Sequence, residues 1–199
     1  MLDPPYLIVR NPALLRLAAA SAIFGAIQLV LSAFLVVYLV SVVGHDLITA
    51  GALLSASQVA GILGRPAWGY LADRTQASRK VLIGLSLGMA LSCTLAAALA
   101  PLGPSWLSLP VVIVFGATAT GWNGVFLAEI MNAVTPAEVG AATSGGLLFT
   151  YGGIVVGPTL FGALAHSAGF VAAFLTLALG GLIAALLVSA MPRSRPVAH

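Results

Sequence analysis

The chain has 199 residues, of which 60% are hydrophobic and only 7% are charged. Soluble globular domains carry about 25% charged residues, so this composition excludes that class. The formal net charge of +3 does not indicate a nucleic-acid partner, because the Lys and Arg residues flank long apolar runs instead of forming one basic patch. We therefore expect an integral membrane protein whose surroundings are the lipid bilayer.

Six apolar runs are long enough to cross a hydrocarbon core of ~30 Å, which takes about 20 residues of helix. Backbone amides in lipid must be hydrogen-bonded within the segment, and these runs lack the alternation of barrel strands. The sequence therefore predicts an all-α, polytopic membrane protein with six transmembrane helices. The predicted spans are 17–43, 49–71, 81–100, 106–128, 141–165 and 170–191.

The basic residues predict the orientation. All except Arg65 lie before the first span, in the connection after the second, or after the sixth: Arg10, Arg16, Arg74, Arg79, Lys80, Arg193 and Arg195. With six spans these places share one side of the membrane, and the positive-inside rule assigns that side to the cytoplasm. We expect both termini to be cytoplasmic, in the inner (plasma) membrane of a bacterium.

A short pattern occurs twice, as GILGRP at 61–66 and GIVVGP at 153–158, an offset of 92 residues. An odd number of spans in each copy would make the two copies face opposite ways across the membrane, as in many secondary transporters. Chance similarity among Gly-rich and Ala-rich spans is the alternative. The expected organisation is a cytoplasmic segment 1–16, a bundle 17–191 with repeat units 17–101 and 106–191, and a cytoplasmic tail 192–199.

Polar side chains are unevenly distributed among the spans. The third and sixth have no Asn, Gln or ionisable residue apart from Cys93, so we expect them at the periphery. Polar groups at mid-membrane depth usually face a bundle interior or a wet cavity, although hydrogen bonding between helices would also explain them. The candidates for a substrate pathway are Gln28, Gln58, Thr120, Asn123 and Tyr151.

The connection after the second span carries the most specific motif. Arg65, Gly69 and Asp73 are spaced by four and share one helix face. The segment 64–80, GRPAWGYLADRTQASRK, resembles the loop between the second and third helices of a six-helix half of the major facilitator superfamily. The resemblance extends over about residues 11–191, looks most like a C-terminal half, and implies secondary transport of a small solute by alternating access.

The resemblance also implies roles for the motif. Asp73 would contact the start of the fifth helix, the basic residues Arg74, Arg79 and Lys80 would contact nearby charges, and all would act in gating. A small residue at Gly69 would let another helix approach closely. Residues 75–78 interrupt the usual pattern of the motif, so the implied roles transfer better to Asp73 and Gly69 than to Arg79 and Lys80. The alternative for Arg74, Arg79 and Lys80 is that they only determine the topology.

Glu129 is predicted near the cytoplasmic end of the fourth span, where the negative end of the helix dipole disfavours a carboxylate. We expect a cationic partner, either Arg65 or Arg74, and keep proton coupling as an alternative. In the fifth span, Gly-rich spacing predicts close helix packing, and the residues concerned are Gly153, Gly157, Pro158 and Gly162.

An enzyme is not expected. Ser144 and His166 faintly resemble the motifs of intramembrane serine proteases, but 22 residues on one helix separate them by ~33 Å. No metal site or cofactor is predicted, nor any Lys or Arg at mid-membrane depth, which argues against tight binding of a strongly anionic solute. We expect a half transporter that acts as a homodimer or with a missing N-terminal six-helix half. The alternative is a membrane remnant or assembly subunit that transports nothing.

Overall fold

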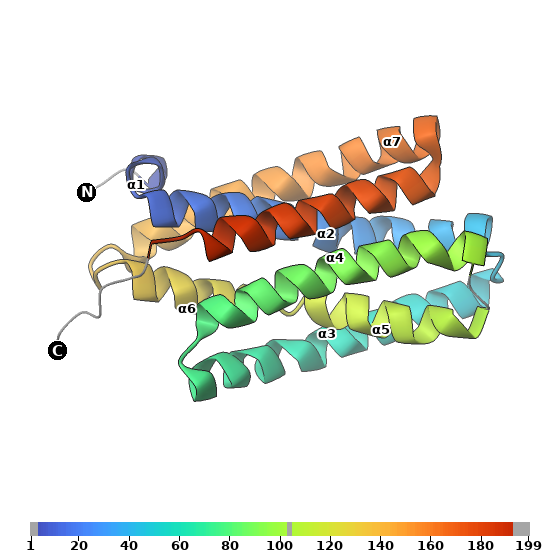
Figure 1. The fold of residues 1–199 in the computed structure, drawn as a ribbon, viewed down its shortest axis with the longest axis horizontal. Helices are drawn as coiled ribbons and strands as arrows, with labels where there is room; N and C mark the ends of the chain where they lie inside the picture. Colours follow the sequence, from blue (N-terminus) through green and yellow to red (C-terminus); the bar gives the residue numbers. More distant parts are fainter. Residues whose placement is uncertain (1–3, 103–104, 193–199) are drawn as a thin grey trace.

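The computed structural model describes residues 4–102 and 105–192, and every regular element in those ranges is helical. The elements are α1 (Pro4–Arg10), α2 (Pro12–Tyr38), the π-helix η1 (Leu39–Val43), α3 (Leu47–Thr75), α4 (Ser78–Leu102), the 3-10 helix η2 (Ser105–Leu107), α5 (Ser108–Ala119), α6 (Asn123–Ala133) and α7 (Val139–Ser189). They form an elongated bundle (Figure 1), in which α1 and the end of α7 lie at the same end. Arg193 and Arg195, and with them all of the predicted tail except Pro192, lie outside the described residues.

Five segments are long and apolar enough to cross a membrane: Pro12–Val43, Leu47–Thr75, Ser78–Leu99, Ser108–Ala133 and Val139–Ser189. The last has 51 residues, which as one straight helix would measure ~77 Å, far more than a bilayer. It contains two helices joined at Gly169, where φ is 86° and ψ is 163°. Figure 1 shows the chain reversing direction between these two helices, at the end of the bundle away from α1. The all-α membrane fold is confirmed, while the count of six helices and the repeat stay predictions.

The helix ends follow from capping side chains. Asn11 caps α2, because its Oδ1 accepts hydrogen bonds from the backbone of Ala13 at 3.0 Å and Leu14 at 3.3 Å. Asp46 caps α3 in the same way, and hydrogen bonds from Thr49 hold the pKa of the Asp46 carboxyl below its usual range. The first span therefore begins earlier than the predicted residue 17, and the predicted segment 1–16 contains α1 and the first turn of α2.

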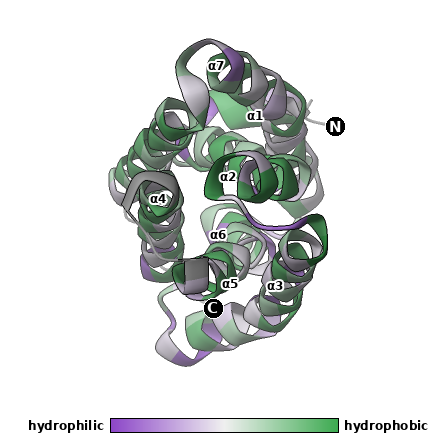
Figure 2. Ribbon diagram, turned by 90° about the vertical axis from the view of Figure 1, so that its right-hand side faces the viewer, coloured by the Kyte–Doolittle hydropathy of each residue, from purple (hydrophilic) through white to green (hydrophobic). Residues whose placement is uncertain are grey.

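Hydrophobic positions occur around the whole bundle (Figure 2), and large apolar side chains are found among both the buried and the exposed residues. α4 shows this division along its length. One face buries Leu82, Met89 and Cys93 completely, and the opposite face exposes leucines at four-residue spacing: Leu87, Leu91 and Leu95. This arrangement fits a helix at the periphery of the bundle.

Candidate transport site

The fourth span is broken in the middle. α5 ends at Ala119 and α6 begins at Asn123, so residues 120–122 interrupt the helix about halfway along the segment Ser108–Ala133. The apolar run 106–128 predicted one continuous helix here, although Gly121 and the Asn123-Gly124 pair are local signals of a break. Backbone groups freed within a membrane need protein partners or a water-filled cavity.

α3 supplies two of those partners. Nε of Arg65 donates to the carbonyl oxygen of Thr120 at 3.1 Å, and Nε1 of Trp68 donates to that of Ala117 at 2.9 Å. Within the described ranges the other guanidinium nitrogens of Arg65 have no hydrogen-bond partner, and its side chain is exposed. The guanidinium of Arg65 therefore lies beside the middle of the fourth span, whereas the sequence was interpreted as having no basic residue at mid-membrane depth.

α2 contacts the break from another side. The Oε1 atom of Gln28 accepts hydrogen bonds from Nε1 of Trp122 at 3.0 Å and from Nδ2 of Asn123 at 3.5 Å. Trp122 is fully buried, and its ring lies 5.2 Å from that of Phe24 and 5.5 Å from that of Phe126. The break is thus anchored to α2 by an amide contact and an aromatic cluster.

The other pathway candidates differ in their surroundings. Gln58 donates from Nε2 to Oγ of Ser32 at 3.2 Å, which links α3 to α2. Thr120 is 3% exposed and donates to its own helix at Gly116. Tyr151 is 60% exposed and makes no hydrogen bond within the described residues. The structure therefore brings Gln28, Thr120 and Asn123 together at the break and leaves Tyr151 outside this network.

The glycines of the fifth span lie against α2. A Cβ atom on Gly153 would come within 1.8 Å of the carbonyl oxygen of Ala22, and one on Gly157 would lie 2.4 Å from Cβ of Ala26. Gly162 faces the ring of Phe34, where the distance would be 3.2 Å. Pro158 lies inside α7 between these contacts. Helices can approach this closely only where one of them lacks a side chain.

Arg79 has a structural role that its place in the basic connection did not predict. Its Nε donates to the carbonyl oxygen of Val188 at 3.0 Å, and its Nη2 donates to those of Met191 at 2.5 Å and Ser189. Arg16 donates to the carbonyl oxygen of Ala190 beside them. The last carbonyls of a helix have no partner within it, so these two arginines cap the C-terminus of α7.

The rest of the motif faces solvent in this structure. Asp73, Arg74 and Lys80 are exposed, and their side chains make no hydrogen bond or ion pair within the described residues. The expected contact between Asp73 and the start of the fifth helix is thus not present. The expected close approach at Gly69 is also absent, because a Cβ atom there would meet nothing within 4 Å. On the same helix, close approach occurs at Gly61, where a Cβ would lie 1.7 Å from Oγ1 of Thr120.

Glu129 does not pair with Arg65 or Arg74, so that expectation was wrong. Its side chain is 8% exposed, and its Oε2 accepts a hydrogen bond from Oγ of Ser78, the first residue of α4. Nδ2 of Asn132 donates to the same hydroxyl at 3.3 Å. The carboxylate therefore lies at the N-terminus of α4, where the positive end of the helix dipole favours it.

Comparison with known proteins agrees with this fold. The sequence profile of the Major Facilitator Superfamily matches residues 4–145. The probable nitrate/nitrite transporter NarK2 of Mycobacterium tuberculosis strain CDC 1551 / Oshkosh is 30% identical over 166 residues, which cover 76% of this chain and 40% of that protein. NarK2 of strain ATCC 25618 / H37Rv matches with the same values. The chain thus spans about two fifths of the length of these relatives, and it belongs to the major facilitator superfamily of membrane transporters.

Proposed function

We propose that the chain is one half of a secondary transporter that moves a small inorganic oxyanion, nitrate or nitrite, by alternating access. The observation that carries this proposal is the guanidinium of Arg65 at the break in the fourth span, with nitrogens left without a protein partner in the described ranges. A guanidinium offers planar, paired N–H donors that match an oxyanion. The substrate named for NarK2 is such an ion.

Its environment supports the same conclusion. An exposed cation at this depth is costly against lipid, so intramembrane Arg residues usually face a bundle interior or a water-filled cavity. The surface that holds Arg65 is therefore proposed to face a second six-helix body. That body is either an N-terminal half or a second copy of this chain.

We further propose six spans arranged as a 3+3 inverted repeat. Gly61 and Gly153 are equivalent under the offset of 92 residues. At both positions a Cβ atom would clash with the neighbouring helix. Gly61 of the second span meets Thr120 of the fourth, and Gly153 of the fifth meets Ala22 of the first. An inverted repeat relates the second and fourth spans to the fifth and first, so these contacts correspond. This support applies equally to the proposed division into units 17–101 and 106–191.

In the proposed cycle both termini are cytoplasmic and the motif after α3 controls the state. Asp73 and Arg74, which have no partner among the described residues, would find partners in another state of the cycle. Arg79 and Glu129 instead hold the ends of α7 and α4 in this state. Lys80 is exposed and Gly69 is half-buried, and both are proposed to lie on the same cytoplasmic side.

Nitrate uptake into proteoliposomes containing the purified chain tests the proposal, with the protein-only mass in lipid nanodiscs measured in parallel. A dimer that takes up nitrate, with uptake lost in Arg65→Gln and kept in Arg10→Gln, an exposed basic position outside the motif, supports a self-sufficient homodimer. A dimer that takes up neither nitrate nor nitrite contradicts the proposal. A monomer that binds nitrate but does not take it up indicates a missing half. A monomer that neither binds nor takes up nitrate favours the non-transporting remnant or assembly subunit.

A further inference from the structure

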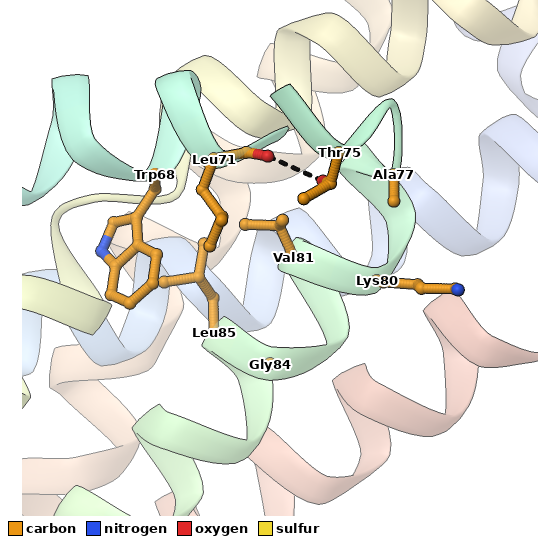
Figure 3. Close-up of a pocket in the computed structure, with 8 residues that line it drawn as sticks. All are labelled: Trp68, Leu71, Thr75, Ala77, Lys80, Val81, Gly84 and Leu85. Atoms are coloured by element: carbon orange, nitrogen blue, oxygen red, sulfur yellow. Dashed lines mark hydrogen bonds between the residues drawn. The ribbon is translucent and has the colours of Figure 1, made fainter. Parts of the chain in front are cut away.

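A groove separate from the proposed anion site lies between the C-terminal part of α3 and the N-terminal part of α4. Figure 3 shows it beside the short connection that joins the two helices. Its volume is 470 Å³. The residues that line it are Trp68, Leu71, Thr75, Ala77, Lys80, Val81, Gly84 and Leu85.

The lining has one charged end and an apolar interior. Lys80 lies at the loop end with its ammonium group pointing outward, and Trp68 lies at the opposite end (Figure 3). Thr75 adds little polarity, because its hydroxyl donates to the carbonyl oxygen of Leu71 at 2.7 Å. From Trp68 to Thr75 the helix rises by ~10 Å, so the groove extends from the membrane surface well into the hydrocarbon region.

The charges near the groove are unequal. Lys80 has no hydrogen-bond or ion-pair partner in the part of the chain that the structure describes, and Asp73 does not line the groove. Arg79, the residue before Lys80, donates its hydrogen bonds to carbonyl oxygens at the end of α7. An anionic group at the mouth of the groove would therefore face Lys80 without competition from a lining carboxylate.

We propose that this groove binds an anionic phospholipid from the cytoplasmic leaflet. Its phosphate would lie at Lys80, and one acyl chain would lie along Val81 and Leu85 toward Trp68. An acyl chain would fill an apolar space in which water is unfavourable. A headgroup with a net negative charge would be attracted to Lys80, whereas a zwitterionic headgroup has no net charge. Gly84 keeps the groove open, because a Cβ atom there would meet nothing within 4 Å.

The fluorescence of Trp68 reports occupancy directly. The chain is reconstituted into phosphatidylcholine vesicles that contain rising fractions of brominated phosphatidylglycerol or, in a matched series, of brominated phosphatidylcholine. The signal of Trp68 is identified by subtracting that of Trp68→Phe, since the chain has three Trp residues. We expect phosphatidylglycerol to quench Trp68 at about fivefold lower mole fraction, the preference that one basic residue at a membrane surface provides.

Two pairs of variants test the two parts of the groove. Lys80→Gln should remove the preference for phosphatidylglycerol, and Arg74→Gln should keep it. Gly84→Leu should prevent quenching by both lipids without a clash, and Gly51→Leu, also in open space, should leave quenching unchanged. Equal quenching by both lipids in the unmodified chain would overturn the proposal. Protection of Trp68 from both lipids would also overturn it, because a protein would then occupy the groove.

Discussion

Arg65 and Thr120 are joined by a hydrogen bond of 3.1 Å between the guanidinium Nε of α3 and a backbone carbonyl at the break between α5 and α6. The break removes the helical partner of that carbonyl, and a charged donor replaces it. Hydrogen bonds to charged groups contribute about 1.5–3 kcal/mol. One contact thus stabilises the interrupted helix and fixes a cation at the level of the break.

Gly153 should tolerate no side chain. In Gly153→Ala the new Cβ would lie 1.8 Å from the carbonyl oxygen of Ala22, a backbone atom, so α2 and α7 must separate. We expect a loss of about 1–3 kcal/mol in stability, measured as a lower thermal midpoint in detergent. Gly152→Ala is the matched control, because its Cβ meets open space. Equal midpoints for the two variants would show that the α2–α7 contact is looser than described.

The contact between Gln28 and Trp122 predicts a non-additive pair of substitutions. Gln28→Leu leaves the buried indole N–H of Trp122 without its acceptor, which costs about 1–3 kcal/mol. Adding Trp122→Phe removes the unsatisfied donor, so the double variant should unfold at a higher temperature than the two separate losses predict. Gln28→Glu, which keeps an acceptor oxygen, is the control. Strict additivity of the two losses would mean that this hydrogen bond contributes nothing to stability.

Arg79 should act as a helix cap. Arg79→Ala frees three backbone carbonyls at the end of α7, and we expect faster amide hydrogen exchange over residues 186–191 and a stability loss of about 1–3 kcal/mol. Arg74→Ala, at an exposed position without such bonds, should change neither quantity. If Arg79→Ala altered transport rates with unchanged exchange, the gating role implied by the family resemblance would be the better account.

Asp73, in contrast to Arg79, should affect the conformational state of the chain and not its stability. Because its carboxylate has no partner in the described residues, Asp73→Asn should leave the thermal midpoint unchanged. If Asp73 forms its contact in another state, the substitution should shift the balance between states. The measurement is labelling of single cysteines from each side of the membrane, in a background where the buried Cys93 is replaced by Ser. Unchanged labelling together with unchanged uptake would remove Asp73 from the gating mechanism.

The membrane class and most helix bounds could be predicted from sequence because they depend on local composition. The turn after the fifth run was expected at residues 166–169, and the backbone departs from helical geometry at Gly169. The break at 120–122 was missed, since no proline marks it and the turn residues Gly121, Asn123 and Gly124 stand inside a long apolar run.

The partners of the charged residues were also beyond sequence reasoning, because they depend on how distant helices pack. Arg79 reaches carbonyls more than 100 residues away, and backbone acceptors leave no trace in the sequence. Glu129 was expected to need a cation, yet a hydroxyl and the N-terminus of α4 compensate it. Gln28 and Asn123 were selected separately as polar residues in apolar spans, and the structure places them in contact.

Equilibrium binding of nitrate to the chain in lipid nanodiscs, followed by isothermal titration calorimetry, tests the central claim most directly. Arg65→Gln should weaken binding by about 10- to 100-fold, the loss of a charged hydrogen-bonding group, and Arg65→Lys should restore part of it because lysine keeps the charge without the paired donors. Arg74→Gln should bind as the unmodified chain does. Nitrate binding of equal affinity in the unmodified chain and in a folded Arg65→Gln variant would contradict the account.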